Sequence, residues 1–274
     1  MSPSVTDRAR RAVRLGLGRS LRAGTVPIRG LARTAIRMRP SLEPRLAGAA
    51  WLWQPGWGRG CHERLYSRPD PYGLVTNAYE QAKYDLIMQT LAGRRYARTL
   101  EVGCGEGLLS ERLVDLTGEL VGVDISEAAT QRARERLEGT DRAWFERRTL
   151  PLDMPDGDFD LIVCSDVLYY WEPGTLRIGM ERLIERLRPG GRLLLLHYLG
   201  DFGQAGDGDS VHDLATRHAA EHAELTHLVA ETLPEAGPGG AGVRLDVLVR
   251  RVADPARPAA QQYRAEQPDG VRTR

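Results

Sequence analysis

The most constraining feature of this sequence is a regular alternation, between residues 74 and 198, of short apolar runs with runs of helical periodicity. An apolar run of about four to eight residues indicates a buried strand, whereas apolar residues three and four positions apart indicate a helix. Strands are expected at residues 98–102, 119–124, 143–148, 159–165 and 192–198, and helices at 79–91, 108–116, 126–137 and 175–187. Strands that alternate with helices favour a parallel sheet with helices on both faces.

The pattern changes after residue 198. A helix is expected at residues 211–220, and two further apolar runs, 225–233 and 243–250, are separated by a stretch rich in glycine and proline. Two such runs joined in this way predict an antiparallel hairpin. The sequence therefore predicts an α/β fold, a doubly wound and mostly parallel seven-stranded sheet with an antiparallel C-terminal hairpin. Residues 188–191, Arg-Pro-Gly-Gly, are expected to form a turn before the fifth strand.

Composition excludes several classes of protein. The 274 residues are 42% hydrophobic and 27% charged, which is typical of a globular protein, and no apolar run approaches the about 20 residues that cross a bilayer. Cys61, Cys104 and Cys164 are widely spaced and form no metal-binding pattern. We therefore expect neither a disulfide framework nor a bound metal, and we expect a cytoplasmic location.

Charge divides the chain into segments. Residues 1–46 hold eleven arginines against Asp7 and Glu43, although the net charge of the whole chain is only +1. This basic arm is expected either to be disordered or to form amphipathic helices, and peripheral contact with a membrane stays open. Residues 47–73 carry Trp51, Trp53 and Trp57 and are expected to form a Trp-rich cap or lid. The main domain is expected at residues 74–252 and a disordered tail at 253–274.

A glycine-rich loop follows the first expected strand. It reads Glu-Val-Gly-Cys-Gly-Glu-Gly from Glu101, and its glycines allow the backbone to approach a ligand closely. Asp124 ends the second expected strand, 21 positions after Gly103. A carboxylate at that position can accept hydrogen bonds from both hydroxyls of a ribose. The two features together predict a nucleoside-containing ligand at the carboxyl ends of the strands.

The loop also indicates which nucleoside is bound. Its spacing differs from the Gly-x-Gly-x-x-Gly pattern that holds a pyrophosphate, which disfavours a dehydrogenase. Glu101 precedes the first glycine by two residues, and a carboxylate there suits a ligand with an ammonium group and no phosphate. The methionine end of S-adenosylmethionine has that chemistry.

Several stretches resemble class I S-adenosylmethionine-dependent methyltransferases. They are the glycine-rich loop, Val-Gly-Val-Asp-Ile-Ser at 121–126, the stretch 156–170 that ends in Asp-Val-Leu-Tyr-Tyr, and Leu-Arg-Pro-Gly-Gly at 187–191. Shorter motifs at 70–73, 79–84, 208–212 and 244–247 are similar to those of the nodulation protein S family. Members of that family methylate the free amine at the non-reducing end of a de-N-acetylated chitooligosaccharide.

The resemblance implies roles for particular residues. Gly103, Cys104 and Gly105 would line the methionine and ribose, Glu101 would orient the ammonium group, Asp124 would bind the ribose and Ile125 would pack on the adenine. Arg148 stands where related enzymes often have an aspartate for the adenine amino group. An arginine offers no acceptor, so backbone near Thr149 and Leu150 would have to make that contact. Ser165, at the end of the fourth strand, is expected to join the cofactor site.

Methyl transfer to an amine requires an unprotonated nitrogen, and a nearby acceptor helps to remove the proton. Asp166 and His197 lie at the ends of the fourth and fifth strands, and His212 lies on the next segment, so these three residues are the catalytic candidates. For both histidines the alternative is a buried side chain satisfied by the backbone. Tyr169, Tyr170 and Trp171 are expected either to stack on a sugar or to belong to the core, and Cys104 and Cys164 to be buried packing residues.

Three functions stay open at this point. The first is N-methylation of a small molecule, with an amino sugar as the expected acceptor. The second is methylation of RNA or a nucleotide, recruited by the arginine arm; the acidic main domain and the absence of an Asn/Asp-Pro-Pro-Tyr sequence disfavour nucleic acid. The third is a catalytically silent binding module.

Overall fold

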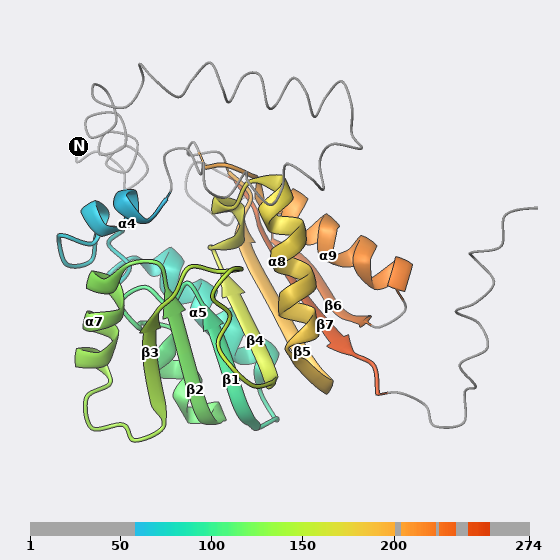
Figure 1. Ribbon diagram of the computed structural model, residues 1–274, viewed down its shortest axis with the longest axis horizontal. Helices are drawn as coiled ribbons and strands as arrows, with labels where there is room; N and C mark the ends of the chain where they lie inside the picture. The colour runs from blue at the N-terminus through green and yellow to red at the C-terminus, as the bar shows by residue number, and fades with distance from the viewer. Residues whose placement is uncertain (1–57, 201–203, 223–224, 234–240, 253–274) are drawn as a thin grey trace, which may run out of the picture.

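The computed structural model describes residues 58–200, 204–222, 225–233 and 241–252, and a seven-stranded sheet forms its centre (Figure 1). The strands are β1 (Tyr96–Val102), β2 (Thr117–Asp124), β3 (Ala143–Arg147), β4 (Phe159–Ser165), β5 (Leu187–Tyr198), β6 (Leu225–Leu233) and β7 (Val243–Arg250). Their order in the sheet is β3-β2-β1-β4-β5-β7-β6. β1 to β5 pair in parallel, whereas β7 runs antiparallel to both β5 and β6. The predicted fold class is confirmed.

Helices lie before β1 and between most of the later strands. They are α4 (Arg59–Leu65), α5 (Ala78–Leu91), α6 (Ser110–Leu113), α7 (Glu127–Arg136), α8 (Pro173–Glu185) and α9 (Gly208–His222), with 3₁₀ turns η3 (Val114–Leu116) and η4 (Leu168–Tyr170). The starts of α5 and α7 follow from local chemistry. The Asn77 side chain accepts a hydrogen bond from the Tyr79 amide, and the Ser126 hydroxyl accepts one from the Ala129 amide, so each helix begins at an N-cap residue.

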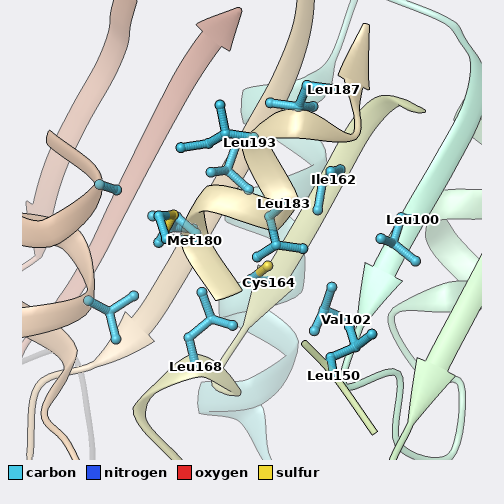
Figure 2. Close-up of a cluster of buried hydrophobic side chains, with 14 of the residues drawn as sticks. Leu100, Val102, Leu150, Ile162, Cys164, Leu168, Met180, Leu183, Leu187 and Leu193 are labelled. Carbon is cyan, nitrogen blue, oxygen red and sulfur yellow. The ribbon is translucent and has the colours of Figure 1, made fainter. Parts of the chain in front are cut away.

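Alternation along the strands produces two hydrophobic cores, one on each face of the sheet. On one face, Leu100, Ile162 and Leu193 pack with Met180 and Leu183 of α8 (Figure 2). On the other face, neighbouring strand residues such as Leu161 and Leu194 pack with side chains of α5, α6 and α7. α8 accordingly covers one face of the sheet and α5 the opposite face (Figure 1). Both faces are buried, which explains why the central strands read as continuous apolar runs.

Three local expectations differ from the structure. The expected turn at residues 188–191 lies inside β5, because Leu187 already pairs with Phe159 and a register shift accommodates the Pro-Gly-Gly sequence. The helix expected at 108–116 is divided into α6 and η3. Within the cap expected at 47–73, residues 59–65 form α4, a short helix with no strong apolar period to announce it.

Some expectations fall outside the described residues. These are the basic arm at 1–46, the tail at 253–274, and the three tryptophans Trp51, Trp53 and Trp57. No helix in the described part of the chain combines the length and the apolar character that crossing a membrane requires.

Candidate active site

A cavity of about 260 Å³ opens at the carboxyl ends of β1, β2 and β4. The winding of the chain reverses between β1 and β4, and ligands of open α/β sheets bind at such a switch point. The expected cofactor residues that line the cavity are Glu101, Gly103, Cys104, Gly105, Asp124, Ile125, Leu150 and Ser165. Thr149 is the expected cofactor residue that does not line it. The structure therefore brings almost the whole expected cofactor set to one cavity.

The glycine-rich loop is tied to β2 by its own backbone. The amides of Gly103 and Cys104 both donate to the Val123 carbonyl, at 2.8 and 3.1 Å. Gly103 has a φ of +73°, and a Cβ atom there would lie 2.5 Å from a Val167 methyl group. Only glycine satisfies both conditions. Because both amides are already engaged, the loop shapes the cavity but does not offer these N–H groups to a ligand.

Asp124 lies between the loop and α7. Its two carboxylate oxygens accept hydrogen bonds from the amides of Gly105, at 3.1 Å, and Ser126, at 2.9 Å. Burial raises the pKa of Asp124, while these two hydrogen bonds oppose the rise. An ionised carboxylate has about four acceptor positions, so Asp124 keeps capacity for the hydroxyls of a ribose.

Glu101 is a buried carboxylate that also lines the cavity. The Ser110 hydroxyl donates to its Oε2 atom over 2.5 Å, and its Oε1 atom has no hydrogen-bond partner among the described residues. Burial raises the pKa of Glu101 to about 8. A buried, half-satisfied carboxylate gains most from a cationic partner, so the site fits the ammonium group of the methionine moiety.

Residues 58–73, the described part of the segment expected as a Trp-rich cap or lid and called the lid below, border the cavity. His62 and Tyr66 of the α4 region and Tyr72 of the following loop are among its lining residues. The Asp70 amide donates to both carboxylate oxygens of Glu106, at 3.1 and 3.0 Å. Glu106 is a buried residue of the glycine-rich loop and also pairs with Arg132 of α7. The lid is thus joined to the glycine-rich loop through Glu106.

A cluster of charged residues occupies another wall. Lys83 of α5 is buried and contacts Asp166 directly and Glu80 at 2.7 Å. Asp166 has a positive φ of +51°, its amide donates to the Leu196 carbonyl, and its Oδ1 atom accepts from the Tyr198 amide at 2.8 Å. Asp166, which the sequence predicts as a catalytic candidate, lines the cavity.

Aromatic side chains surround this charged cluster. Tyr169 and Tyr170 meet edge to face with ring centroids 4.9 Å apart, and Tyr79 and Tyr198 meet at 6.3 Å. Tyr169, Tyr170 and Trp171, which the sequence left between sugar stacking and the core, line the cavity. Tyr169 and Trp171 also belong to the hydrophobic core. Tyr169 and Trp171 therefore contribute both to the core and to the cavity wall.

His197 and His212 lie away from the cavity. Both are fully buried, and neither is among the lining residues. The Leu168 amide donates to Nε2 of His197, so the proton of this ring sits on Nδ1, which donates to Nε2 of His212 at 3.1 Å. Nδ1 of His212 in turn donates to Asp246 at 2.5 Å. Every ring nitrogen is used, so neither histidine is positioned to take a proton from a bound acceptor.

Arg148 and the two buried cysteines behave as structural groups. Arg148 lines the cavity but pairs with Glu146 and Asp153, at 2.5 and 2.8 Å. Burial raises the pKa of both Cys104 and Cys164, so their thiols stay protonated and serve as packing groups.

Sequence reasoning did not select Glu80 or Lys83 as site residues. Their spacing of three positions on α5 is unremarkable, because such pairs commonly lie on the solvated face of a helix. One signal was available: Lys83 is the only lysine among the 38 basic residues of the sequence. A chain that otherwise uses arginine throughout has a lysine where a compact ammonium group fits between two carboxylates.

The sequence is similar to a family of known proteins. The family model of Nodulation protein S (NodS) matches residues 61–203. A nodulation protein S of Azorhizobium caulinodans is 34% identical over 127 residues, and the alignment covers 46% of this chain and 61% of that protein. One from Sinorhizobium fredii is 28% identical over 193 residues, covering 69% of this chain and 85% of that protein.

A solved structure is similar in fold. It is the N-methyltransferase NodS of Bradyrhizobium japonicum WM9 in complex with S-adenosyl-L-homocysteine, with a TM-score of 0.61 and 23% sequence identity. The superposition covers 69% of this chain and 95% of that chain. At this identity the match supports the class I methyltransferase fold, which agrees with the observed strand order.

Proposed function

Because this chain belongs to the nodulation protein S family of S-adenosylmethionine-dependent methyltransferases, we propose that it transfers a methyl group to the amine of an amino sugar or oligosaccharide. The observation that carries the proposal is one cavity lined by two groups of acidic residues. The first end, as we call it, holds Glu101 and Asp124, and the second end holds Glu80 and Asp166 with Lys83, beside a group of tyrosines.

The first end suits S-adenosylmethionine. Asp124 accepts hydrogen bonds from the ribose hydroxyls, Glu101 pairs with the methionine ammonium group, and Ile125 packs against the adenine. S-Adenosylmethionine supplies an activated methyl group on a sulfonium centre. The chain itself contributes binding and orientation, since an in-line displacement depends mainly on how the nucleophile is positioned.

The second end suits an amine acceptor. Glu80 and Asp166 carry two negative charges against the one positive charge of Lys83, which favours a cationic ligand. Aromatic rings of Tyr79, Tyr169 and Tyr170 border the same space and suit both an ammonium group and the apolar face of a sugar ring. The Bradyrhizobium protein is an N-methyltransferase, which agrees with an amine as the acceptor.

The test is a transfer assay with isotope-labelled S-adenosylmethionine. The acceptor is a chitooligosaccharide with one free terminal amine, and the fully acetylated sugar is the matched control. Mass spectrometry should find one methyl group or more on the free-amine sugar and none on the control. Equal labelling of both sugars would instead indicate methylation of a hydroxyl group.

Two further outcomes would change the proposal. Cofactor binding with no turnover on any amine would favour the silent binding module. Labelling of RNA but not of the sugar would favour the nucleic-acid alternative. We also infer a cytoplasmic location, since Cys61, Cys104 and Cys164 are all unpaired, as expected in a reducing compartment.

A further inference from the structure

The charged cluster contains one more carboxylate than it needs for charge balance. Glu80 and Asp166 both contact Lys83, and all three side chains lie in the wall of the cavity. Lys83 is 5% exposed and Glu80 is 14% exposed, so solvent compensates little of the excess. Two carboxylates that share one ammonium group leave one uncompensated negative charge, and a proton or a cation is needed to neutralise it.

Asp166 has both of its carboxylate oxygens engaged by neighbours. One oxygen contacts Lys83, and the other accepts a hydrogen bond from the Tyr198 amide. Its backbone is held in the left-handed region by a hydrogen bond to β5. Asp166 is therefore placed to hold Lys83 and not to face a bound acceptor.

Glu80 has the opposite arrangement. Its Oε2 atom contacts Lys83, whereas its Oε1 atom has no hydrogen-bond partner in the described part of the chain. Burial, together with the charge of Asp166, raises the pKa of Glu80 above its ordinary value, although Lys83 opposes this rise. The free oxygen and the raised proton affinity are what a general base in a cavity requires.

Lys83 cannot act as the base. Burial alone would lower its pKa, but the facing carboxylates of Asp166 and Glu80 raise the pKa above the ordinary range. Lys83 therefore stays protonated and serves to position the two carboxylates. Its ammonium group also lies 4.9 Å from the centre of the Tyr79 ring, which adds a cation–π contact.

We propose that Glu80 is the catalytic proton acceptor of this cavity and that Lys83 and Asp166 position it; this deepens the proposed function and rests on it. The protonated amine R–NH₃⁺ transfers one proton to Oε1 of Glu80. The nitrogen lone pair then forms the bond to the methyl carbon, while the carbon–sulfur bond breaks and its electron pair stays on sulfur. The products are R–NH₂⁺–CH₃ and the neutral thioether, and the proton on Glu80 leaves to solvent as the product departs.

The pH dependence of the reaction rate involves every titratable group that faces Glu80. These groups are Tyr79, Lys83 and Tyr84 on α5, Asp70 of the lid, Asp166 after β4 and Tyr169 of η4. The tyrosine pKa values are all raised, mainly by burial, so these hydroxyls stay neutral at physiological pH. Protonation of Glu80 itself should therefore dominate the acidic limb of the rate profile.

The test compares Glu80→Gln with Asp85→Asn. Asp85 lies on α5 like Glu80, but its carboxylate is exposed and pairs with Arg112 of α6. We measure kcat/KM on the free-amine sugar from pH 6 to pH 10. Glu80→Gln should lose about 100-fold at pH 7, a typical general-base contribution, and the loss should shrink at high pH, where the amine is already unprotonated. A loss that is equal at every pH, or smaller than about threefold relative to Asp85→Asn, would overturn the proposal.

A second measurement does not depend on the acceptor. In protein labelled with ¹³C at the glutamate carboxyl groups, the resonance that disappears in Glu80→Gln is followed during a pH titration. An apparent pKa above that of an ordinary glutamate supports Glu80 as the proton acceptor, and an ordinary or lowered pKa overturns it. If the wild-type chain methylates no amino sugar, the proposed function fails, and the titration still decides the role of Glu80.

Discussion

The hydroxyl of Ser126 donates a hydrogen bond to the carboxylate of Glu63 over 2.8 Å, although the two residues lie 63 positions apart. The amides of Glu127 and Ala128 also donate to this carboxylate, at 2.9 and 3.4 Å. Glu63 of α4 thus occupies the N-terminus of α7, where a negative charge is favourable. The contact joins the lid to α7, the helix that begins three residues after Asp124.

We therefore expect Glu63→Ala to release the lid from α7. The cofactor should dissociate about three- to tenfold faster, because a cap of this kind contributes about 1 kcal/mol. Stopped-flow displacement of bound S-adenosylhomocysteine measures the rate. Glu138→Ala, an exposed change just beyond α7, is the control, and equal rates in the two variants would show that Glu63 does not restrain the lid.

Asp124→Asn tests the ribose contact. Replacing the carboxylate should weaken cofactor binding by about 10- to 100-fold, since hydrogen bonds to a charged group contribute about 1.5–3 kcal/mol. Calorimetric titration with S-adenosylhomocysteine gives the Kd. Asp115→Asn, at an exposed position of η3, should leave the Kd unchanged. An unaltered Kd in Asp124→Asn would remove this residue from the cofactor site.

Glu101 should make cofactor affinity depend on pH. Its folded pKa is about 8, so near pH 7 the free protein carries it mostly protonated, and binding a cationic ammonium group must displace that proton. Affinity should rise from pH 6.5 towards about pH 8 and fall again above it, because an α-amino group loses its own proton near pH 8. Calorimetry in buffers of different ionisation enthalpy should detect proton release at pH 7.

The matching variant is Glu101→Gln. It should bind the cofactor more weakly, and its cofactor affinity should show only the fall above pH 8.

Glu101→Gln should also change how the free energy of unfolding depends on pH. A carboxyl group whose folded pKa exceeds its unfolded value destabilises the fold increasingly as pH rises between the two values. The free energy of unfolding of wild type should therefore fall from pH 6.5 to 8 more steeply than that of Glu101→Gln.

Local pattern was sufficient for most of the fold and for the cofactor end of the site. The alternation of apolar runs predicted every strand of the sheet, and β4 was predicted with its observed ends, Phe159–Ser165. Glu101, the glycine loop and Asp124 were identified because each lies at a strand end, where position along the chain fixes position in space. Neighbouring strand ends then bring these residues together without further information.

The acceptor end depends on contacts that no local pattern contains. Lys83 of α5 meets Asp166, which follows β4, across 83 positions, and Glu80 joins the cluster only through its contact with Lys83. His197 and His212 illustrate the converse case. Their positions near the end of β5 and on α9 predicted the correct end of the sheet, but not that each ring nitrogen would be used by a neighbour.

The hydrogen bonds that join His197, His212 and Asp246 should contribute to the stability of the fold. His212→Ala removes the group that joins His197 to Asp246 and leaves buried polar atoms without partners, so the free energy of unfolding should fall by about 2–3 kcal/mol. Arg217→Ala, at an exposed position of α9, is the control. Urea titration followed by circular dichroism measures the difference, and a change no larger than the control would contradict the buried network.

The hydrogen-bonded network of His197, His212 and Asp246 also predicts that the folded state loses stability in acid. Burial lowers the pKa of His197 and of His212 below the ordinary 6.5, with the His212 charge adding to the effect on His197. The folded state therefore binds fewer protons than the unfolded state below pH 6.5, and stability is lost as pH falls from there. Unfolding free energies at pH 7 and pH 5.5 should differ more in wild type than in His212→Ala.

Lys83 also gives the protein a built-in chemical reporter. The sequence contains no other ε-amino group, and this one lies beneath the tyrosines of the cavity wall. Because Lys83 is paired with Glu80 and Asp166 and stays protonated, a lysine-directed acylating reagent should modify it only when these contacts break, so the modification rate of this one side chain records how often the charged cluster opens. Bound acceptor should slow that modification, which turns the single lysine into a reporter of occupancy at this wall of the cavity.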